Sequence, residues 1–340
     1  MVIVRPIETA DIDALMTIAE ASGHGFTSLP LNRDLLERKI KRSEASFSAE
    51  IAGPHDEGYL MVLEDTETGE VVGTSGIEAA VGLVDAFYHY RLGTEVYHSE
   101  KLAVRNEVET LTMCHDYTGA AELCTLFLKK DYRHSGNGRL LSKHRFLFMA
   151  QHPHRFGERV IAEMRGVSDE QGQSPFFDWL QKHFFTIDFP YADYLSGMGE
   201  KSFMAELMPR NPIYTCLLPT EAQQVIGRVH PNTRPALKLL EAEGLRCRGY
   251  VDIFDAGPTV ECLLSDIVSV RNSDNYQVVI VDALPEEGVK ALAANNKTQD
   301  YRAAQVTVHV EAQDALVYVT HKQATALKVQ QGDTLRLLLS

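Results

Sequence analysis

The stretch ELCTLFL, residues 122–128, followed by RHSGNGRLL, residues 133–141, decides the fold of this chain. The first segment is short, apolar and bounded by polar residues, which is typical of a buried β-strand. The second opens on glycines and continues as an apolar-periodic run from Leu140 to Ala150, which predicts a helix. The pair therefore predicts a strand, a tight glycine turn and a helix.

The glycine turn has the composition of a diphosphate-binding site. Gly136 and Gly138 let the backbone turn tightly around Asn137 and leave amide N–H groups pointing outward. The start of the following helix adds about half a positive charge from its aligned peptide dipoles. Arg133 and Arg139 flank the turn and add charge-assisted hydrogen bonds. These five residues are the expected diphosphate ligands.

The segments on either side extend this unit into a mixed sheet. A short strand at Val2 to Arg5 precedes two helical patterns, and two β-rich runs, Tyr59 to Glu64 and Val71 to Ala80, form a hairpin pattern. Another apolar strand pattern, Arg159 to Met164, follows the helix. The order β, α, α, β, β, β, α, β predicts a mixed α/β sheet.

The composition changes near Leu264, and short β-rich runs dominate the remainder. These runs cover residues 276–281, 304–310, 315–319 and 334–339 and are separated by turn residues. They predict a small β-barrel of about 75 residues. The expected organisation is therefore an α/β domain over residues 1–265 and a barrel domain over residues 266–340.

The bulk composition restricts the partners. The 340 residues carry a net charge of −14, which disfavours nucleic acid because phosphate neutralisation needs a basic face. No apolar run is long enough to span a membrane, and the N-terminal segment carries carboxylates where a signal peptide needs an apolar core. Five singly scattered cysteines argue against a metal site and for a reducing cytoplasm.

The arrangement resembles the GNAT superfamily of acyl-coenzyme A transferases. The glycine turn follows a buried strand, which is preceded by a hairpin and a β-α-α unit, and a late helix runs from Ala236 to a glycine at Gly244. A Rossmann or P-loop interpretation fits less well, since G-x-G-x-x-G and GK[ST] are both missing. Leu240 stands where the superfamily usually has the tyrosine that protonates the leaving thiolate, which leaves that role to another group.

Longer blocks resemble the bacterial arginine N-succinyltransferase family more specifically. They are SLP (28–30), VLEDTETG (62–69), AELCTLFL (121–128), AEMRGVSDEQGQSPFF (162–177), IGRVHP (226–231) and VDIFDAGPTVEC (251–262). The resemblance implies a GNAT-like fold and a ternary complex of succinyl-CoA and L-arginine without a metal. In that complex the α-amino group attacks the thioester to give N2-succinylarginine and CoA, the first step of arginine catabolism by the succinyltransferase route. It also implies a homo-oligomer or a pairing with a homologous subunit.

The same resemblance implies roles for two residues. His230 in V-H-P is the expected proton donor, and Leu126 in TLFL is expected to bind succinyl-CoA. Both roles make chemical sense, because imidazole titrates near neutrality and a strand backbone beside the turn can polarise the thioester oxygen. The structural alternative for His230 is capping of the helix that follows.

The substrate requires further groups. Glu122 is a candidate base for the α-amino proton, although a structural carboxylate on the strand is an equally good interpretation. Asp252 and Asp255, with Glu261 nearby in sequence, are candidates for the guanidinium, and solvated loop acids are the alternative. Arg165 follows a buried strand, where an isolated charge is costly, and is a candidate for the succinyl carboxylate.

Three competing functions stay open from the sequence. One is a related acyltransferase that prefers ornithine or another amine. The second is a non-catalytic subunit that binds CoA or arginine without turnover. The third gives the function to the C-terminal barrel and treats the first domain as its support.

Overall fold

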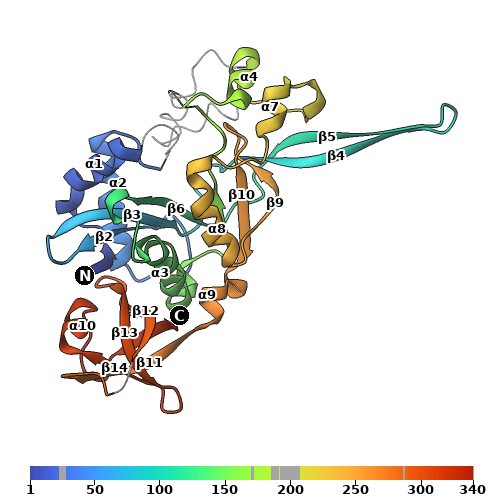
Figure 1. Ribbon diagram of the computed structural model, residues 1–340. Helices are drawn as coiled ribbons and strands as arrows, with labels where there is room; N and C mark the ends of the chain where they lie inside the picture. The colour runs from blue at the N-terminus through green and yellow to red at the C-terminus, as the bar shows by residue number, and fades with distance from the viewer. Residues whose placement is uncertain (23–27, 170–171, 185–190, 192–206, 286–287, 340) are drawn as a thin grey trace.

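The computed structural model of the chain describes residues 1–22, 28–169, 172–184, 191, 207–285 and 288–339 (Figure 1). Its described strands form one continuous mixed sheet. In spatial order the main part contains β1 (Val2–Pro6), β2 (Gly58–Asp65), β3 (Glu70–Glu78), β6 (Ala121–Leu128), β7 (Arg159–Glu163), β10 (Pro258–Leu263), β9 (Arg246–Val251), β4 (His89–Ser99), β5 (Val104–Cys114) and β8 (Ile213–Tyr214). All neighbours are antiparallel except β6 and β7, which run parallel.

Helices cover both faces of this sheet, and the alternation of side chains along β2 shows how. Leu60 and Val62 lie in one apolar cluster with helices α1 (Ile12–Ser22) and α2 (Arg33–Ser48). Met61 and Leu63 point to the opposite face and pack with helix α3 (Asn137–Gln151). On that second face α8 (Arg234–Ala242) and the short α9 (Val268–Arg271) contact α3.

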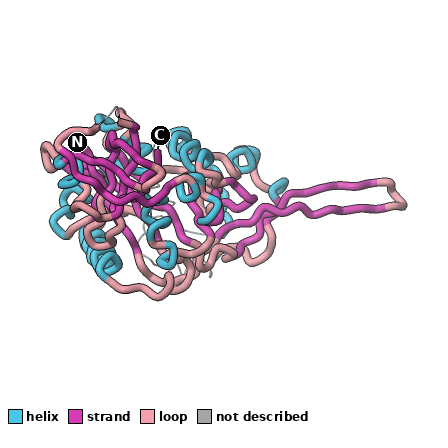
Figure 2. The backbone as a smooth tube through the Cα atoms, turned by 90° about the horizontal axis from the view of Figure 1, so that it is seen from below, coloured by secondary structure: helices cyan, strands magenta, loops and turns pink. Residues whose placement is uncertain are grey.

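Two further helices cover the other end of the sheet. Helices α4 (Pro175–Phe184) and α7 (Thr220–Val225) pack against each other. Their buried residues Phe176, Phe177 and Leu180 share a cluster with Tyr90 of β4 and Leu111 of β5. Beyond that cluster β4 and β5 continue as a two-stranded arm that projects away from the body (Figure 2). The sequence patterns did not predict this arm.

The C-terminal strands close into a small barrel. They are β11 (Ser273–Val281), β12 (Val289–Asn295), β13 (Ala303–Glu311), β14 (Leu316–Thr320) and β15 (Thr334–Leu339), with helix α10 (His321–Ala326) between the last two. The order β12-β15-β11-β14-β13 is closed by pairing of β12 with β13. The mixed α/β fold with a small barrel is therefore confirmed, although the alanine-rich β12 was not predicted.

The barrel is tied closely to the main sheet. Strand β13 pairs with β1 at Ala303 and Val4, and Tyr301 donates a hydrogen bond from its hydroxyl to the carbonyl of His144 on α3 at 3.0 Å. Leu292 and Tyr301 belong to the same apolar core as α3. The domain boundary expected at residue 265 stays a prediction, with the qualification that the two parts share a core.

In the described part of the chain, helices long and apolar enough to cross a membrane are not found.

Candidate active site

The two parallel strands at the centre of the sheet separate soon after they start. Strands β6 and β7 pair only at Ala121 with Val160 and at Glu122 with Ile161. Beyond these residues the strands diverge, so the ladder opens in the middle of the sheet. Parallel strands that stop pairing leave backbone N–H and C=O groups that need other partners. A ligand lying between the strands is one way to supply them.

A bulge interrupts β6 inside this opening. Thr74 of β3 pairs with Phe127 and Gly76 pairs with Cys124, so one residue of β3 faces both Thr125 and Leu126. Thr125 has a φ of 56°, a left-handed conformation that a β-branched residue rarely adopts. Such strain is stored where the surroundings enforce it, and a bulge redirects the strand. The strand therefore changes direction at Leu126, where the sequence predicted succinyl-CoA binding.

The predicted glycine turn connects β6 to α3 and has an ordered interior. Gly136 has a φ of 82° and stands directly before α3. The Asn137 side chain is buried and donates from Nδ2 to the carbonyl of Tyr132 at 3.0 Å, so it holds the turn together. Gly138 and Arg139 occupy the first helical turn, whose amide N–H groups have no carbonyl partner within a helix. Asn137 therefore holds the turn in shape, and the predicted contact of its neighbours with a diphosphate stays a prediction.

Positive charge gathers around this turn. Arg133 donates from Nε to the carbonyl of Leu128 at 3.0 Å and so ties the turn to the end of β6. Arg139 lines a groove between α3 and the barrel, together with Lys143 and Lys290. On the barrel side Gln305 donates from Nε2 to the carbonyl of Gly136 at 3.1 Å. Lys143 is paired with Glu243, with 2.7 Å between Nζ and Oε1, so Arg139 and Lys290 give the groove its positive charge in a protein of net charge −14.

Three of the sequence blocks converge beyond the end of β7. Gly166 forms a bridge with Val229, and the amide of His230 donates to the carbonyl of Arg165 at 2.8 Å. The predicted residues Arg165 and His230 are therefore brought together. Arg165 also donates from Nη2 to the hydroxyl of Ser168 at 2.9 Å. Residues 170 and 171 of the AEMRG block lie outside the described part of the chain.

The environment of His230 defines its protonation state. Nδ1 accepts a hydrogen bond from the amide of Asn232 at 3.2 Å, at the start of a short 3₁₀ turn, so the capping alternative is present in the structure. Burial first, and then the charge of Arg165, lower the pKa of His230 below its ordinary value. The neutral ring with its proton on Nε2 satisfies both observations. Leu240 on the following helix is buried in the core.

The side chains of the two predicted aspartates, Asp252 and Asp255, accept hydrogen bonds from backbone amides. Asp252 accepts from the amides of Phe254 and Asp255 at 2.7 and 2.8 Å. Asp255 accepts from the amides of Gly166 and Gly257, also at 2.7 and 2.8 Å. Asp255 therefore fixes the segment that carries Arg165 through Gly166, and Asp252 holds the loop that carries Asp255. Their predicted contact with a guanidinium stays a prediction.

A group of carboxylates lies on the α1–α2 face of the central strands. Glu78 of β3 pairs with Glu122 of β6, which pairs in turn with Ile161 of β7. Glu163 is two residues further along β7 and points to the same face as Ile161. It contacts the buried His89, with 3.0 Å between Oε1 and Nε2. Sequence reasoning selected Glu122 but missed Glu163, whose position only the pairing register reveals.

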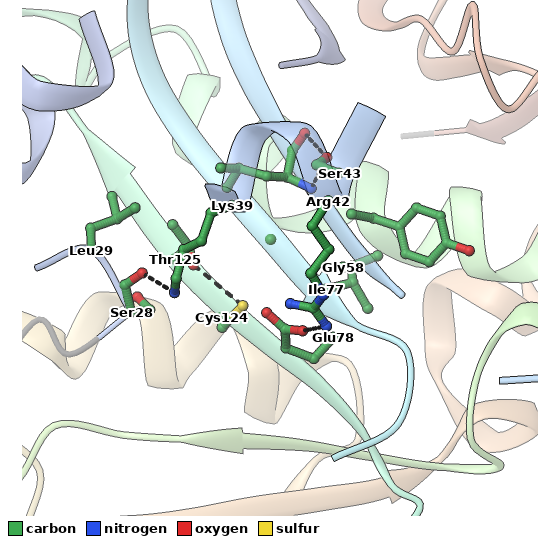
Figure 3. A pocket seen from close by; sticks show the side chains of 13 residues that line it. Ser28, Leu29, Lys39, Arg42, Ser43, Gly58, Ile77, Glu78, Cys124 and Thr125 are labelled. Carbon is green, nitrogen blue, oxygen red and sulfur yellow. Dashed lines mark hydrogen bonds and ion pairs between the residues drawn. The ribbon is translucent and has the colours of Figure 1, made fainter. Parts of the chain in front are cut away.

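Figure 3 shows a small pocket on this same face, beginning at the bulge. Cys124 and Thr125 of β6 form one wall, and Lys39 and Arg42 of α2 form the other. Glu78 lies at its edge. Lys39 and Arg42 belong to a basic cluster, residues 38–42, and were not candidates from the sequence because such a cluster on a helix is most often a solvated face. Groups that would hold a metal ion are not found among the described residues.

Comparison with known proteins gives a consistent result. The family described as "Arginine N-succinyltransferase beta subunit" matches residues 2–269, and its C-terminal domain matches residues 275–338. The arginine N-succinyltransferases of Salmonella typhimurium and Salmonella newport are 48% identical over 338 residues, 99% of this chain and 97% of each relative. The structure of arginine/ornithine succinyltransferase subunit AI from Pseudomonas aeruginosa has a TM-score of 0.90 and 37% identity, covering 100% of this chain and 98% of that one. The chain belongs to the arginine N-succinyltransferase beta subunit family.

Proposed function

We propose that this chain is an arginine N-succinyltransferase, which transfers the succinyl group of succinyl-CoA to the α-amino group of L-arginine. The observation that carries the proposal is the continuity of β6, its bulge and the glycine turn. An acyl-CoA needs a diphosphate site, a slot for its extended arm and a polar group at the thioester. These three features follow one another along residues 121–139.

The coenzyme would lie along β6 in the opposite direction to the chain. Its diphosphate binds the amides of the glycine turn, with Arg133 and Arg139 beside it, and its arm fills the opening between β6 and β7. The thioester then reaches the bulge, where backbone near Leu126 stabilises the negative charge that develops on its oxygen. The proposal thereby gives the strain at Thr125 a function.

The transfer requires two proton movements. The α-amino group loses a proton, for which we propose Glu122 as the base, and its nitrogen forms a bond to the thioester carbon. The carbon–sulfur bond breaks and the thiolate leaves with the electron pair. We propose that His230 is the proton donor in its protonated form: the imidazolium passes a proton to this sulfur and returns to the neutral ring, whose Nδ1 accepts from Asn232 at rest. Arg165, next to His230, contributes positive charge close to the leaving group.

The test is a thiol-release assay with succinyl-CoA and, in parallel, L-arginine, L-ornithine or no amine. We expect release that depends on arginine and a product with the mass of N2-succinylarginine. A higher kcat/KM for ornithine would favour the related acyltransferase, an alternative raised by the name of the Pseudomonas aeruginosa relative. Binding of both ligands without thiol release would identify a non-catalytic subunit and contradict the proposal.

We further propose that the protein works in the cytoplasm as a homo-oligomer or paired with a homologous subunit, and that the β4–β5 arm contacts a second copy. Strand β9 pairs with β4 only at Tyr90 and Arg91, and β8 pairs with β5 only at Thr110 and Leu111. The outer arm is thus a two-stranded ribbon with open edges among the described residues, which is marginally stable by itself. It exposes large apolar side chains: Val96, Tyr97, Leu102 and Val104.

The charges of the arm favour a copy of the same arm as the partner. Acidic residues occupy its middle (Glu95, Glu107, Glu109), and its tip carries His98, Lys101 and Arg105 beside a single acid, Glu100. A two-fold arrangement of antiparallel arms places each tip against the acidic middle of the other. The arm is therefore self-complementary in charge.

Leu102→Glu tests this contact, because Leu102 is 71% exposed at the tip and an added charge opposes burial there. Leu217→Glu is a matched control, since Leu217 is 75% exposed on a 3₁₀ turn away from the tip. Light scattering after gel filtration should show a smaller particle for Leu102→Glu alone. An unchanged mass for both variants, or a monomeric parent protein, would contradict the arm contact.

A further inference from the structure

The pocket at the bulge has residues of β3 and β6 on one side and two cations of α2 on the other (Figure 3). It is lined by Gly76 and Ile77 of β3, Cys124 and Thr125 of β6, and Lys39 and Arg42 of α2. Burial raises the pKa of the Cys124 thiol to about 12, so this group is neutral and adds no charge to the wall.

The two cations differ in their partners. Arg42 is neutralised within the protein, since its Nη2 lies 2.7 Å from Oε2 of Glu78 and 3.2 Å from Oδ1 of Asp56. Lys39 donates from Nζ to the carbonyl of Ser28 at 2.7 Å. No carboxylate oxygen of the described residues lies within ion-pair distance of this Nζ. An ammonium group has three donors, so Lys39 retains both charge and donors for a ligand.

We propose that Lys39 binds the distal carboxylate of the succinyl group and thereby selects a dicarboxylic acyl donor. The inference rests on the proposed function, because it places the thioester at the bulge of β6. From there the two methylene groups of the succinyl chain pass Cys124 and Thr125. The carboxylate then meets an ammonium whose geometry the Ser28 carbonyl already fixes. Arg165, the candidate for this carboxylate from the sequence, lies beside His230.

Lys39→Met tests the proposal, because methionine keeps the length of the side chain and removes the charge. The probes are succinyl-CoA and butyryl-CoA, which have acyl chains of equal length and differ in the distal carboxylate. We expect kcat/KM for succinyl-CoA to fall about ten- to a hundredfold, the size of a lost hydrogen bond to a charged group. The kcat/KM for butyryl-CoA and the KM for L-arginine should stay unchanged. Lys41 is an exposed lysine on the same helix, and Lys41→Met is the control, which should leave kcat/KM unchanged for both acyl donors.

A fall of equal size with both acyl donors would overturn the proposal, as would a rise confined to the KM for arginine. Kd values for succinyl-CoA and butyryl-CoA, measured by calorimetry without arginine, report the preference for succinyl-CoA independently of turnover. If the parent protein binds both equally, Lys39 does not select the acyl group. If it prefers succinyl-CoA and Lys39→Met loses this preference while arginine-dependent transfer is missing, the proposed function fails and the inference stands.

Discussion

At the scale of single residues, His230 has a structural role that the hydrogen bonds show and a chemical role that we propose. Its Nδ1 caps a 3₁₀ turn and its backbone amide anchors the segment that carries Arg165. The sequence indicated His230 through a family resemblance and named capping as the alternative. The sequence could not show that His230 lies beside Arg165, because the two residues are 65 positions apart in the chain.

His230→Gln should lower kcat by about two to four orders of magnitude, the usual range for a proton-transfer group. The KM for succinyl-CoA should change little, because the ring lies beyond the coenzyme's diphosphate site. His154→Gln, on an exposed turn, is the matched control. Steady-state thiol release measures both constants. A variant that retains the parent kcat would remove His230 from the mechanism.

The pH dependence of kcat/KM should reflect the ionisation of the His230 imidazole. Its pKa is lowered in the folded protein, so the neutral form persists below the ordinary value of about 6.5. Protonation at lower pH fills the Nδ1 lone pair and breaks the hydrogen bond from Asn232. Because the ring must be protonated to protonate the leaving sulfur, kcat/KM should fall as the pH rises through this lowered pKa, and this ionisation should be missing in His230→Gln. An apparent pKa above 6.5 for this ionisation would contradict the lowered pKa of His230.

At the scale of elements, the strand, turn and helix over residues 121–151 could be predicted because their signals are local. The apolar run, the glycines and the helical period each act over a few residues. The bulge at Thr125 was not predictable, since it arises from the register between β6 and β3. The β4–β5 arm was missed because its charged, exposed residues lack the alternating apolar pattern of a half-buried strand.

Gly138→Ala separates a folding role of the turn from a binding role. An added Cβ would lie 3.9 Å from the nearest atom, Cδ2 of Leu128, so the protein has room for it. Alanine in a helix gains about 0.5–1 kcal/mol over glycine, and the melting temperature should rise slightly. The methyl group nevertheless crowds the amides that face the diphosphate, and the KM for succinyl-CoA should increase about tenfold. An unchanged KM in this stabilised variant would argue against diphosphate binding at the turn.

At the scale of the whole molecule, the sequence predicted the order of elements and the existence of the barrel. It did not predict that the barrel and the main sheet share a core. The sequence predicted two parts with a boundary at residue 265. In the structure Tyr301, fully buried, fills space against α3, and β13 continues the main sheet through β1. Such contacts join residues more than 150 positions apart, and no local pattern reports them.

A chain ended at Leu264 should therefore fail to fold on its own. It would expose the face of α3 that packs on Leu292 and Tyr301, and leave the outer edge of β1 without its neighbour β13. Soluble yield and the cooperativity of thermal unfolding measure this outcome against the full chain. A monodisperse, cooperatively unfolding product would show that the two parts are independent domains.

The central claim is that the chain from residue 121 to 139 carries an acyl thioester by its diphosphate. A crystal structure of the protein with CoA and L-arginine tests it most directly, through the positions of the two diphosphate phosphorus atoms. We expect their oxygens to accept hydrogen bonds from the amides around Gly138, and the coenzyme arm to lie between β6 and β7. A diphosphate bound elsewhere, with the space between those strands filled by side chains, would contradict it.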